Sequence, residues 1–235
     1  MKRAVLVFVL VCGFALSAFG QSVNDFQFVV NNGQITITGY TGTIMDVVIP
    51  ERINGLPVVA IGNYAFRNNQ LTNVSIPNSV SHIGELAFSW NQLTSVSIPN
   101  SVSHIGDSAF WRNQLTSVSI PNSVSYIGDF AFSWNQLTSV SIPNSVSHIS
   151  DGAFSHNQLT SVSIPNSVSH IGNYAFVSNR LTSVSIPNSV SHIGDLAFRN
   201  NQLTAVSLPT SISHINEDRT FDRNVRIIWR YVPTY

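Results

Sequence analysis

The sequence predicts a mainly β solenoid built from 22-residue coils. Three residue types return at this fixed interval and together predict it. Leucine recurs at positions 71, 93, 115, 137, 159, 181 and 203. Proline recurs at 77, 99, 121, 143, 165, 187 and 209, and phenylalanine at 66, 88, 110, 132, 154, 176 and 198. Because an internal period of about 20 to 50 residues is typical of repeat architectures, the chain should stack similar units along one axis.

Each coil begins with a short strand. In the coil that starts at Leu93, the spacing of Leu93, Val96 and Ile98 places all three on one side of an extended segment, which should face the core. The serines between them should point outward. Pro99 cannot donate a backbone hydrogen bond, so it should end the strand and begin a turn.

The second half of the coil should form the opposite wall. Val102 and Ile105 are spaced to bury another extended stretch, and Gly106 allows a backbone bend there. Asp107 is placed to cap a short helical turn. The coil then ends at Asn113, whose amide can satisfy turn groups of the neighbouring coil. Since one coil cannot bury its own apolar side, about eight coils should share one core over residues 44–221.

The first 20 residues differ from the rest and read as a secretory signal peptide. Lys2 and Arg3 precede an apolar run over 4–16, and the small residues of 17–20 suit cleavage before Gln21. The apolar run is too short to span a membrane stably. Cys12, the only cysteine, lies inside this segment, so we expect a mature chain without thiol chemistry.

The repeat resembles a known family. The string Leu-Thr-Ser-Val-Ser-Ile-Pro, followed by Val-x-x-Ile-Gly-x-x-Ala-Phe, is similar to the BspA-like (treponemal-type) leucine-rich-repeat family over about residues 34–221. The resemblance implies a leucine-rich-repeat fold and adhesion to host matrix proteins, host cells or other microbes. Family repeats are commonly longer by one residue and often carry cysteine where Asn113 stands, which leaves the tightness and curvature of the coils open.

Both ends of the solenoid should be capped. Residues 21–43 contain two alternating segments joined by Asn32-Gly33, which predicts a β-hairpin over the first coil. Residues 222–235 should form the C-terminal cap. Charged residues gather around this end in an otherwise charge-poor chain, and a polar last coil limits end-to-end association.

Three columns of residues are nearly uniform from coil to coil. The first is the outward hydroxyl face of Thr94, Ser95, Ser97 and their equivalents, which could bind a partner or ice but is more simply a soluble strand surface. The second is a histidine ladder that acid could loosen, with Tyr126 interrupting it: His82, His104, His148, His170, His192 and His214. The third is an acidic ladder suited to capping turns: Glu85, Asp107, Asp129, Asp151, Asp195 and Glu217. Neither ladder has the converging ligands of a metal site, so we predict no metal and no cofactor.

The variable positions line one edge and supply the candidate binding residues. Tryptophan and arginine dominate binding hot spots, so this edge is the predicted contact site. Its residues are Trp90, Trp111, Arg112, Trp134, His156, Phe130 and Tyr174. The alternative is that these rings only shield the core.

Composition narrows the function. Positive and negative residues balance at 11 each and only 9% of residues are charged, against roughly 25% in an average soluble protein. A nucleic-acid partner would need a basic face. Most Ser, His and Asp residues of the coils belong to repeated columns, whereas catalysis needs one differentiated constellation, so no enzyme is expected.

The sequence therefore predicts an exported, adhesin-like binding protein. Its partner would be an extracellular or cell-surface protein or a glycan, and its location secreted or at the cell surface, with the periplasm as a further location. The alternative is a structural or self-assembling spacer of the envelope or periplasm, whose uniform faces bind only further copies.

Overall fold

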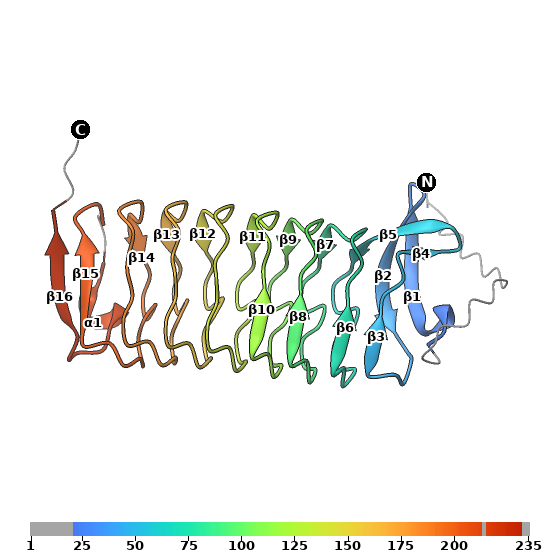
Figure 1. Cartoon of the computed structure of the whole chain (residues 1–235), viewed down its shortest axis with the longest axis horizontal. Coiled ribbons are helices and arrows are strands. Elements are labelled where there is room, and N and C mark those ends of the chain that lie inside the picture. The colour runs from blue at the N-terminus through green and yellow to red at the C-terminus, as the bar shows by residue number, and fades with distance from the viewer. Residues whose placement is uncertain (1–20, 213–214, 232–235) are drawn as a thin grey trace, which may run out of the picture.

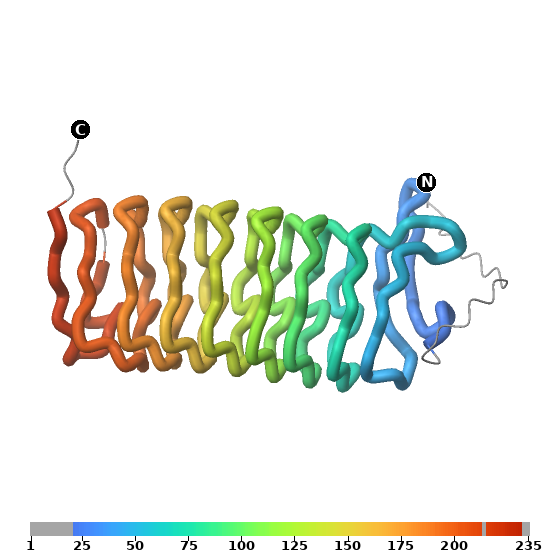
Figure 2. The backbone as a smooth tube through the Cα atoms, viewed as in Figure 1, coloured from blue at the N-terminus to red at the C-terminus, as the bar shows by residue number. Residues whose placement is uncertain are grey.

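A computed structural model describes residues 21–212 and 215–231. The expected signal peptide, His214 and residues 232–235 lie outside these ranges. The described chain winds into an elongated solenoid of about nine turns, with the N-terminal hairpin at one end and β16 at the other (Figures 1 and 2). The mainly β solenoid with 22-residue coils is confirmed.

The solenoid has one turn more than the sequence analysis predicts. The extra turn comes from the C-terminal segment, where β16 (Arg226–Arg230) pairs in parallel with β15 (Ala205–Pro209). Phe221 also continues the column of core phenylalanines, with its ring centroid 5.6 Å from that of Phe198. Residues beyond 221 thus extend the stack as well as closing it.

One wall of the solenoid is formed by strands that carry the histidine ladder. They pair in the order β1 (Phe26–Asn31), β2 (Gln34–Tyr40), β5 (Leu56–Ile61), β7 (His82–Ile83), β9 (His104–Ile105) and β11 (Tyr126–Ile127). A short strand, β4 (Arg52–Ile53), pairs with β5. A separate sheet then continues the wall with β12 (His148–Ile149), β13 (His170–Ile171) and β14 (His192–Ile193).

The break between β11 and β12, here called the seam, coincides with one substitution. Glycine follows the wall strand at 84, 106, 128, 172 and 194, but serine stands at 150. A Cβ on Gly106 would lie 2.7 Å from backbone atoms of the previous coil. Glycine is therefore required for close approach of neighbouring coils and not for the bend expected at Gly106. At the seam the hydroxyl of Ser150 donates to the carbonyl of Ile127, in place of a backbone N–H.

The opposite wall carries the outward serines. Its strands are β3 (Asp46–Val48), β6 (Asn73–Ser75), β8 (Ser95–Ser97), β10 (Ser117–Ser119) and β15. Single bridges at serines 141, 163, 185 and 207 connect the later coils. Val96 is buried while Ser95 and Ser97 are exposed, so the predicted alternation is confirmed.

The N-terminal hairpin is present as predicted. β1 and β2 pair antiparallel, and the turn residues Asn32 and Gly33 both have left-handed φ angles, of 51° and 74°. A one-turn 3-10 helix, η1 (Val23–Asp25), precedes the hairpin. Tyr40 packs its ring on Phe66, with centroids 5.6 Å apart, so the hairpin covers the first ring of the core.

The core contains a column of stacked phenylalanines flanked by a column of asparagines. Adjacent Phe rings from Phe66 to Phe198 have centroids 5.1–5.8 Å apart. Asn113 accepts from Leu93 N at 3.1 Å and donates to the carbonyls of Phe88 at 2.9 Å and Phe110 at 3.1 Å. The predicted role of the asparagine amide between coils is confirmed.

The expected short helical turns are instead pairs of tight turns. Leu86 and Ser108 have left-handed φ angles of 54° and 55°, which interrupt a helix. Asp107 does not cap its own turn, because its Oδ1 accepts from Asp129 N of the next coil at 3.0 Å. The described residues contain a single α-helix, α1 (Glu217–Thr220), near the C-terminal end. No helix in 21–212 or 215–231 is long and apolar enough to cross a membrane.

Candidate functional site

Four candidate residues occupy the same position in four successive coils. Trp90, Arg112, Trp134 and His156 each follow a buried serine or Trp111 and precede a buried asparagine. Their φ angles are left-handed, between 51° and 58°. This turn points the side chain outward next to a buried asparagine, so side chains of successive coils align along the solenoid. Together with Trp111 they are called the aromatic row below.

Arg112 lies among three tryptophans. Its guanidinium carbon is 4.4 Å from the ring centroid of Trp90, 4.9 Å from that of Trp111 and 5.1 Å from that of Trp134. The ring of Trp90 meets that of Trp111 edge-on at 5.4 Å. Each cation–π contact contributes about 0.5–1 kcal/mol at an exposed site, so the row is held in one arrangement before any partner arrives.

The stacking leaves some ring faces covered and others bare. Trp134 has Arg112 of the preceding coil on one side and His156 of the following coil on the other, with the His156 ring centroid 4.3 Å away. Burial lowers the pKa of His156 below its ordinary value. Trp134 therefore presents mainly ring edges to a partner, whereas Trp90 has a face that Arg112 does not cover.

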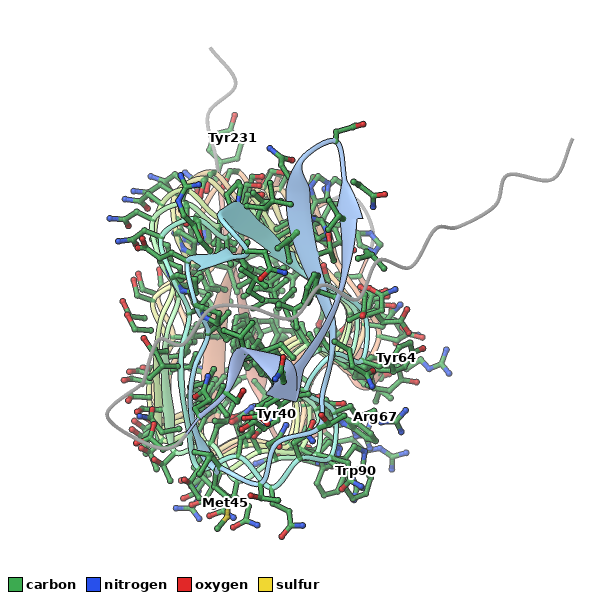
Figure 3. The ribbon with its side chains drawn as sticks, turned by 90° about the vertical axis from the view of Figure 1, so that its right-hand side faces the viewer. Tyr40, Met45, Tyr64, Arg67, Trp90 and Tyr231 are labelled. Atoms are coloured by element: carbon green, nitrogen blue, oxygen red, sulfur yellow. The ribbon has the colours of Figure 1, made fainter. Side chains whose placement is uncertain are left out.

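A hollow that the sequence analysis missed adjoins this bare face. It has a volume of about 620 Å³ and is lined by Tyr64, Arg67, Asn68 and Trp90. Figure 3, which views the solenoid from its N-terminal end, shows Tyr64, Arg67 and Trp90 projecting from the same side. Arg67-Asn68 is the pair equivalent to Ser89-Trp90 one coil earlier, so the repeat period is the signal in the sequence that marks this position.

Phe130 and Tyr174 lie in a different position of the coil. A Cβ on Gly152 would lie 2.2 Å from the Phe130 ring, so Phe130 fills the space that a side chain at 152 would need. None of the ring contacts between described residues joins Phe130 or Tyr174 to the aromatic row. The structure thus brings together five of the seven candidate residues and leaves these two apart.

A second, larger groove follows the turns after the serine strands. It has a volume of about 910 Å³ and is lined by Asn100 and by residues 119–123, 141–144 and 163–166. The lining repeats Ser, Ile, Pro and Asn and includes no aromatic or charged side chain. It therefore offers little to distinguish one partner from another.

Comparison with known proteins gives the family. The model of the "BspA type Leucine rich repeat region" matches residues 59–180 and 103–227, which together span more than half of the chain. The chain belongs to the BspA-type leucine-rich-repeat family. A search of curated proteins found no match.

Solved leucine-rich-repeat structures resemble this BspA-type chain to different degrees, and the one from Bacteroides ovatus shares its fold. A leucine-rich-repeat protein from Bacteroides ovatus is 23% identical with a TM-score of 0.64, and the match covers 90% of this chain and 67% of the other. A leucine-rich-repeat protein from T. pallidum is 25% identical with a TM-score of 0.35, covering 89% of this chain and 81% of the other. A leucine-rich cell surface protein from Faecalibacterium prausnitzii is 21% identical with a TM-score of 0.36, covering 93% and 96%.

The histidine ladder of this BspA-type solenoid forms stacked rings. Centroids are 4.2 Å apart for His82 and His104, and 4.7 Å apart for His148 and His170. Burial lowers the pKa of His104, and the charge of His82 lowers it further, while Asp107 opposes the shift. The described residues hold no group of three His, Cys, Asp or Glu side chains that could bind a metal ion. Within the stack, burial and the neighbouring histidine thus disfavour protonation of His104.

Proposed function

We propose that this leucine-rich-repeat protein is an exported, adhesin-like binding protein that contacts an extracellular or cell-surface protein or glycan through the aromatic row. The observation that carries the proposal is the clustering of Trp90, Trp111, Arg112 and Trp134 at one exposed place. Three of the four tryptophans of the chain lie there.

The geometry of the row suits recognition of a large partner. Trp90 and Trp134 keep exposed fractions of 41% and 47% although they are stacked. Side chains that are already ordered lose less conformational entropy when a partner binds them. Tryptophan and arginine are also the side chains that most often dominate binding energy in interfaces.

Export is supported by the sequence of residues 1–20, whose positive start, apolar run and small residues are typical of a signal peptide. We place the mature protein outside the cytoplasm, secreted or at the cell surface, with the periplasm as the other location.

The second candidate function is a self-assembling spacer. β16 pairs only with β15 among the described strands, and Ile228 and Trp229 are exposed on it. An open strand edge can template pairing with another chain. Arg226 and Arg230 on the same strand oppose such pairing, because charged side chains blunt an edge.

Solid-phase binding to matrix proteins and glycans tests both functions. The row variant combines Trp90→Ser, Trp111→Ser, Arg112→Ser and Trp134→Ser. The control variant removes exposed apolar side chains elsewhere, with Tyr126→Ser, Ile228→Ser and Trp229→Ser. Both must match the circular dichroism of the wild type.

Saturable binding that the row variant loses and the control variant keeps supports the adhesin-like function. If the row variant binds every partner as the wild type does, the row is not the contact site. Concentration-dependent assembly that the control variant alone loses favours the spacer.

A further inference from the structure

We propose that the hollow between Tyr64, Arg67, Asn68 and Trp90 is a subsite for an anionic sugar ring, so that the partner of the aromatic row is an acidic glycan. This inference rests on the proposed function, since it names the ligand class of the same edge. The carboxylate of a uronic acid and the sulfate of a sulfated sugar share the chemistry that the hollow offers.

The hollow is a vacant position in the stack. Asn68 has a φ angle of 57° and Trp90 one of 56°, so both occupy the same left-handed turn position in successive coils. The next four coils place a ring or a guanidinium here, whereas the first coil places only a short amide and the last two coils place Ser178 and Asn200. The face of Trp90 turned away from Arg112 is therefore bare, and a flat ring of a ligand can continue the stack there.

The polar groups around that face suit a sugar. A pyranose ring packs its C–H face on an indole and needs hydrogen-bond partners for the hydroxyls at its rim. The exposed amide of Asn68 both donates and accepts. The hydroxyl of Tyr64 donates to Glu85 Oε1 at 3.2 Å, which leaves its oxygen able to accept from a sugar hydroxyl.

The charge at the hollow favours an anion. Among the described residues the single ion pair joins Arg219 and Asp195, so Arg67 has no carboxylate partner within salt-bridge distance. Its guanidinium carbon lies 5.7 Å from the Tyr64 ring centroid, and Arg112 lies on the far side of Trp90. Glu85 is held by the Tyr64 hydroxyl and does not line the hollow. The planar guanidinium of Arg67 can bind a carboxylate or sulfate through two hydrogen bonds.

The openness of the hollow argues against a protein side chain as its occupant. Hot-spot side chains of protein partners are anchored in closely packed pockets from which water is excluded. Here Tyr64 is 47% exposed and Trp90 41%, so an inserted side chain would stay hydrated. A sugar ring loses little in such a place, because its rim hydroxyls can remain bonded to water.

Isothermal titration calorimetry of the purified protein tests the subsite. The probes are a heparin oligosaccharide for sulfate, an oligogalacturonate for carboxylate, and a neutral cello-oligosaccharide. Asn68→Trp fills the vacant position with a ring that the same backbone geometry already accepts at 90 and 134. Asn200→Trp is the matched control, because Asn200 has the same turn position and a φ angle of 57° at the other end of the solenoid. Arg67→Gln removes the cation alone.

We expect at least one acidic probe to bind, with affinity reduced at least tenfold by Asn68→Trp and by Arg67→Gln but unchanged by Asn200→Trp. The sulfated and carboxylated arms show which anion is preferred. Equal binding of the neutral probe, or binding that Asn68→Trp leaves intact, would overturn the proposal. A matrix protein that binds through the row and is indifferent to Asn68→Trp would keep the proposed function and remove the glycan subsite.

Discussion

The seam at Ser150 leads to a prediction that can be tested in both directions. Gly128 N donates to Ile105 O at 2.8 Å and Ser125 N donates to Ser103 O at 3.0 Å, which joins two coils of the histidine wall. A Cβ on Gly128 would lie 2.5 Å from Asp107 N and 2.7 Å from Gly106 C, so the coils must separate to admit it. Gly128→Ser should therefore create a second seam, and Ser150→Gly should close the existing one.

The loss in free energy of unfolding follows from the backbone hydrogen bonds that break between the two coils. Two backbone hydrogen bonds are lost, and each contributes about 0.5–1.5 kcal/mol net to stability, which gives about 1–3 kcal/mol. The new serine hydroxyl can restore one bond, as Ser150 does with the carbonyl of Ile127. We expect Gly128→Ser to lower the free energy of unfolding by about 1 kcal/mol. Gly128→Ala, which has no hydroxyl, should cost about 1 kcal/mol more than the serine.

Native-state hydrogen exchange measures the opening directly, and urea denaturation followed by circular dichroism measures its cost. The amides of 125 and 128 should exchange faster in Gly128→Ser, while those of 147 and 150 should become protected in Ser150→Gly. The reasoning would be refuted by unchanged protection of amide 128 in Gly128→Ser. It would also be refuted if the alanine variant were as stable as the serine variant.

Three further predictions follow from the core, the ladder and the row. Asn113→Ala leaves Leu93 N without its partner and removes one of the two amide donors of Phe88 O and of Phe110 O, so urea denaturation should show a loss of about 2–4 kcal/mol, and a loss below about 1 kcal/mol would contradict the role of the amide. Burial lowers the pKa of His170, and the charges of His148 and His192 lower it further, so the folded chain binds protons less readily than the unfolded chain, whose histidines titrate near pH 6.5. Stability should thus be fully present above that pH and fall as the pH drops toward the lowered folded pKa; His170→Tyr, which copies Tyr126, should flatten this dependence, and an unchanged slope would count against it. Arg112→Gln removes three cation–π contacts and should lower the free energy of unfolding by about 1–2 kcal/mol while changing the near-UV circular dichroism of the tryptophans, whereas an unaltered spectrum would show that the row is not stacked in solution.

The sequence was sufficient to predict the strand walls, the core and the N-terminal hairpin, because these depend on the spacing of apolar and turn residues. The alternation around Val96 and the Asn32-Gly33 turn each follow from local chemistry that every coil repeats. The stacked column at Trp90, Arg112 and Trp134 was predicted only as a shared edge. Its contacts depend on a left-handed backbone at residues other than glycine, which side-chain preference alone does not indicate.

The sequence could not show what Gly106 does, because that depends on the approach of another coil. A glycine after a strand is compatible with a bend, a turn or a close contact, and only the 2.7 Å approach of Glu85 N identifies the contact. The prediction of short helical turns was wrong for a related reason. Asp107 stands where a helix cap would stand, but its carboxylate bonds to the coil that follows, 22 residues away.

In a solenoid of near-identical coils, a single departure from the repeat acts at one place, and its effect can be assessed against its neighbours. Ser150 in place of glycine opens the wall, and Asn68 in place of a ring leaves a hollow beside Trp90. Ser150 and Asn68 differ in whether neighbouring groups replace the interaction that is lost. Ser150 is compensated within the chain by its own hydroxyl, whereas the bare face of Trp90 has no compensating group among the residues that line the hollow. A ligand can cover the bare face of Trp90 and pair with Arg67, which has no carboxylate partner among the described residues. The N-terminal end of the row, and not the seam, is therefore the better place to search for a binding partner.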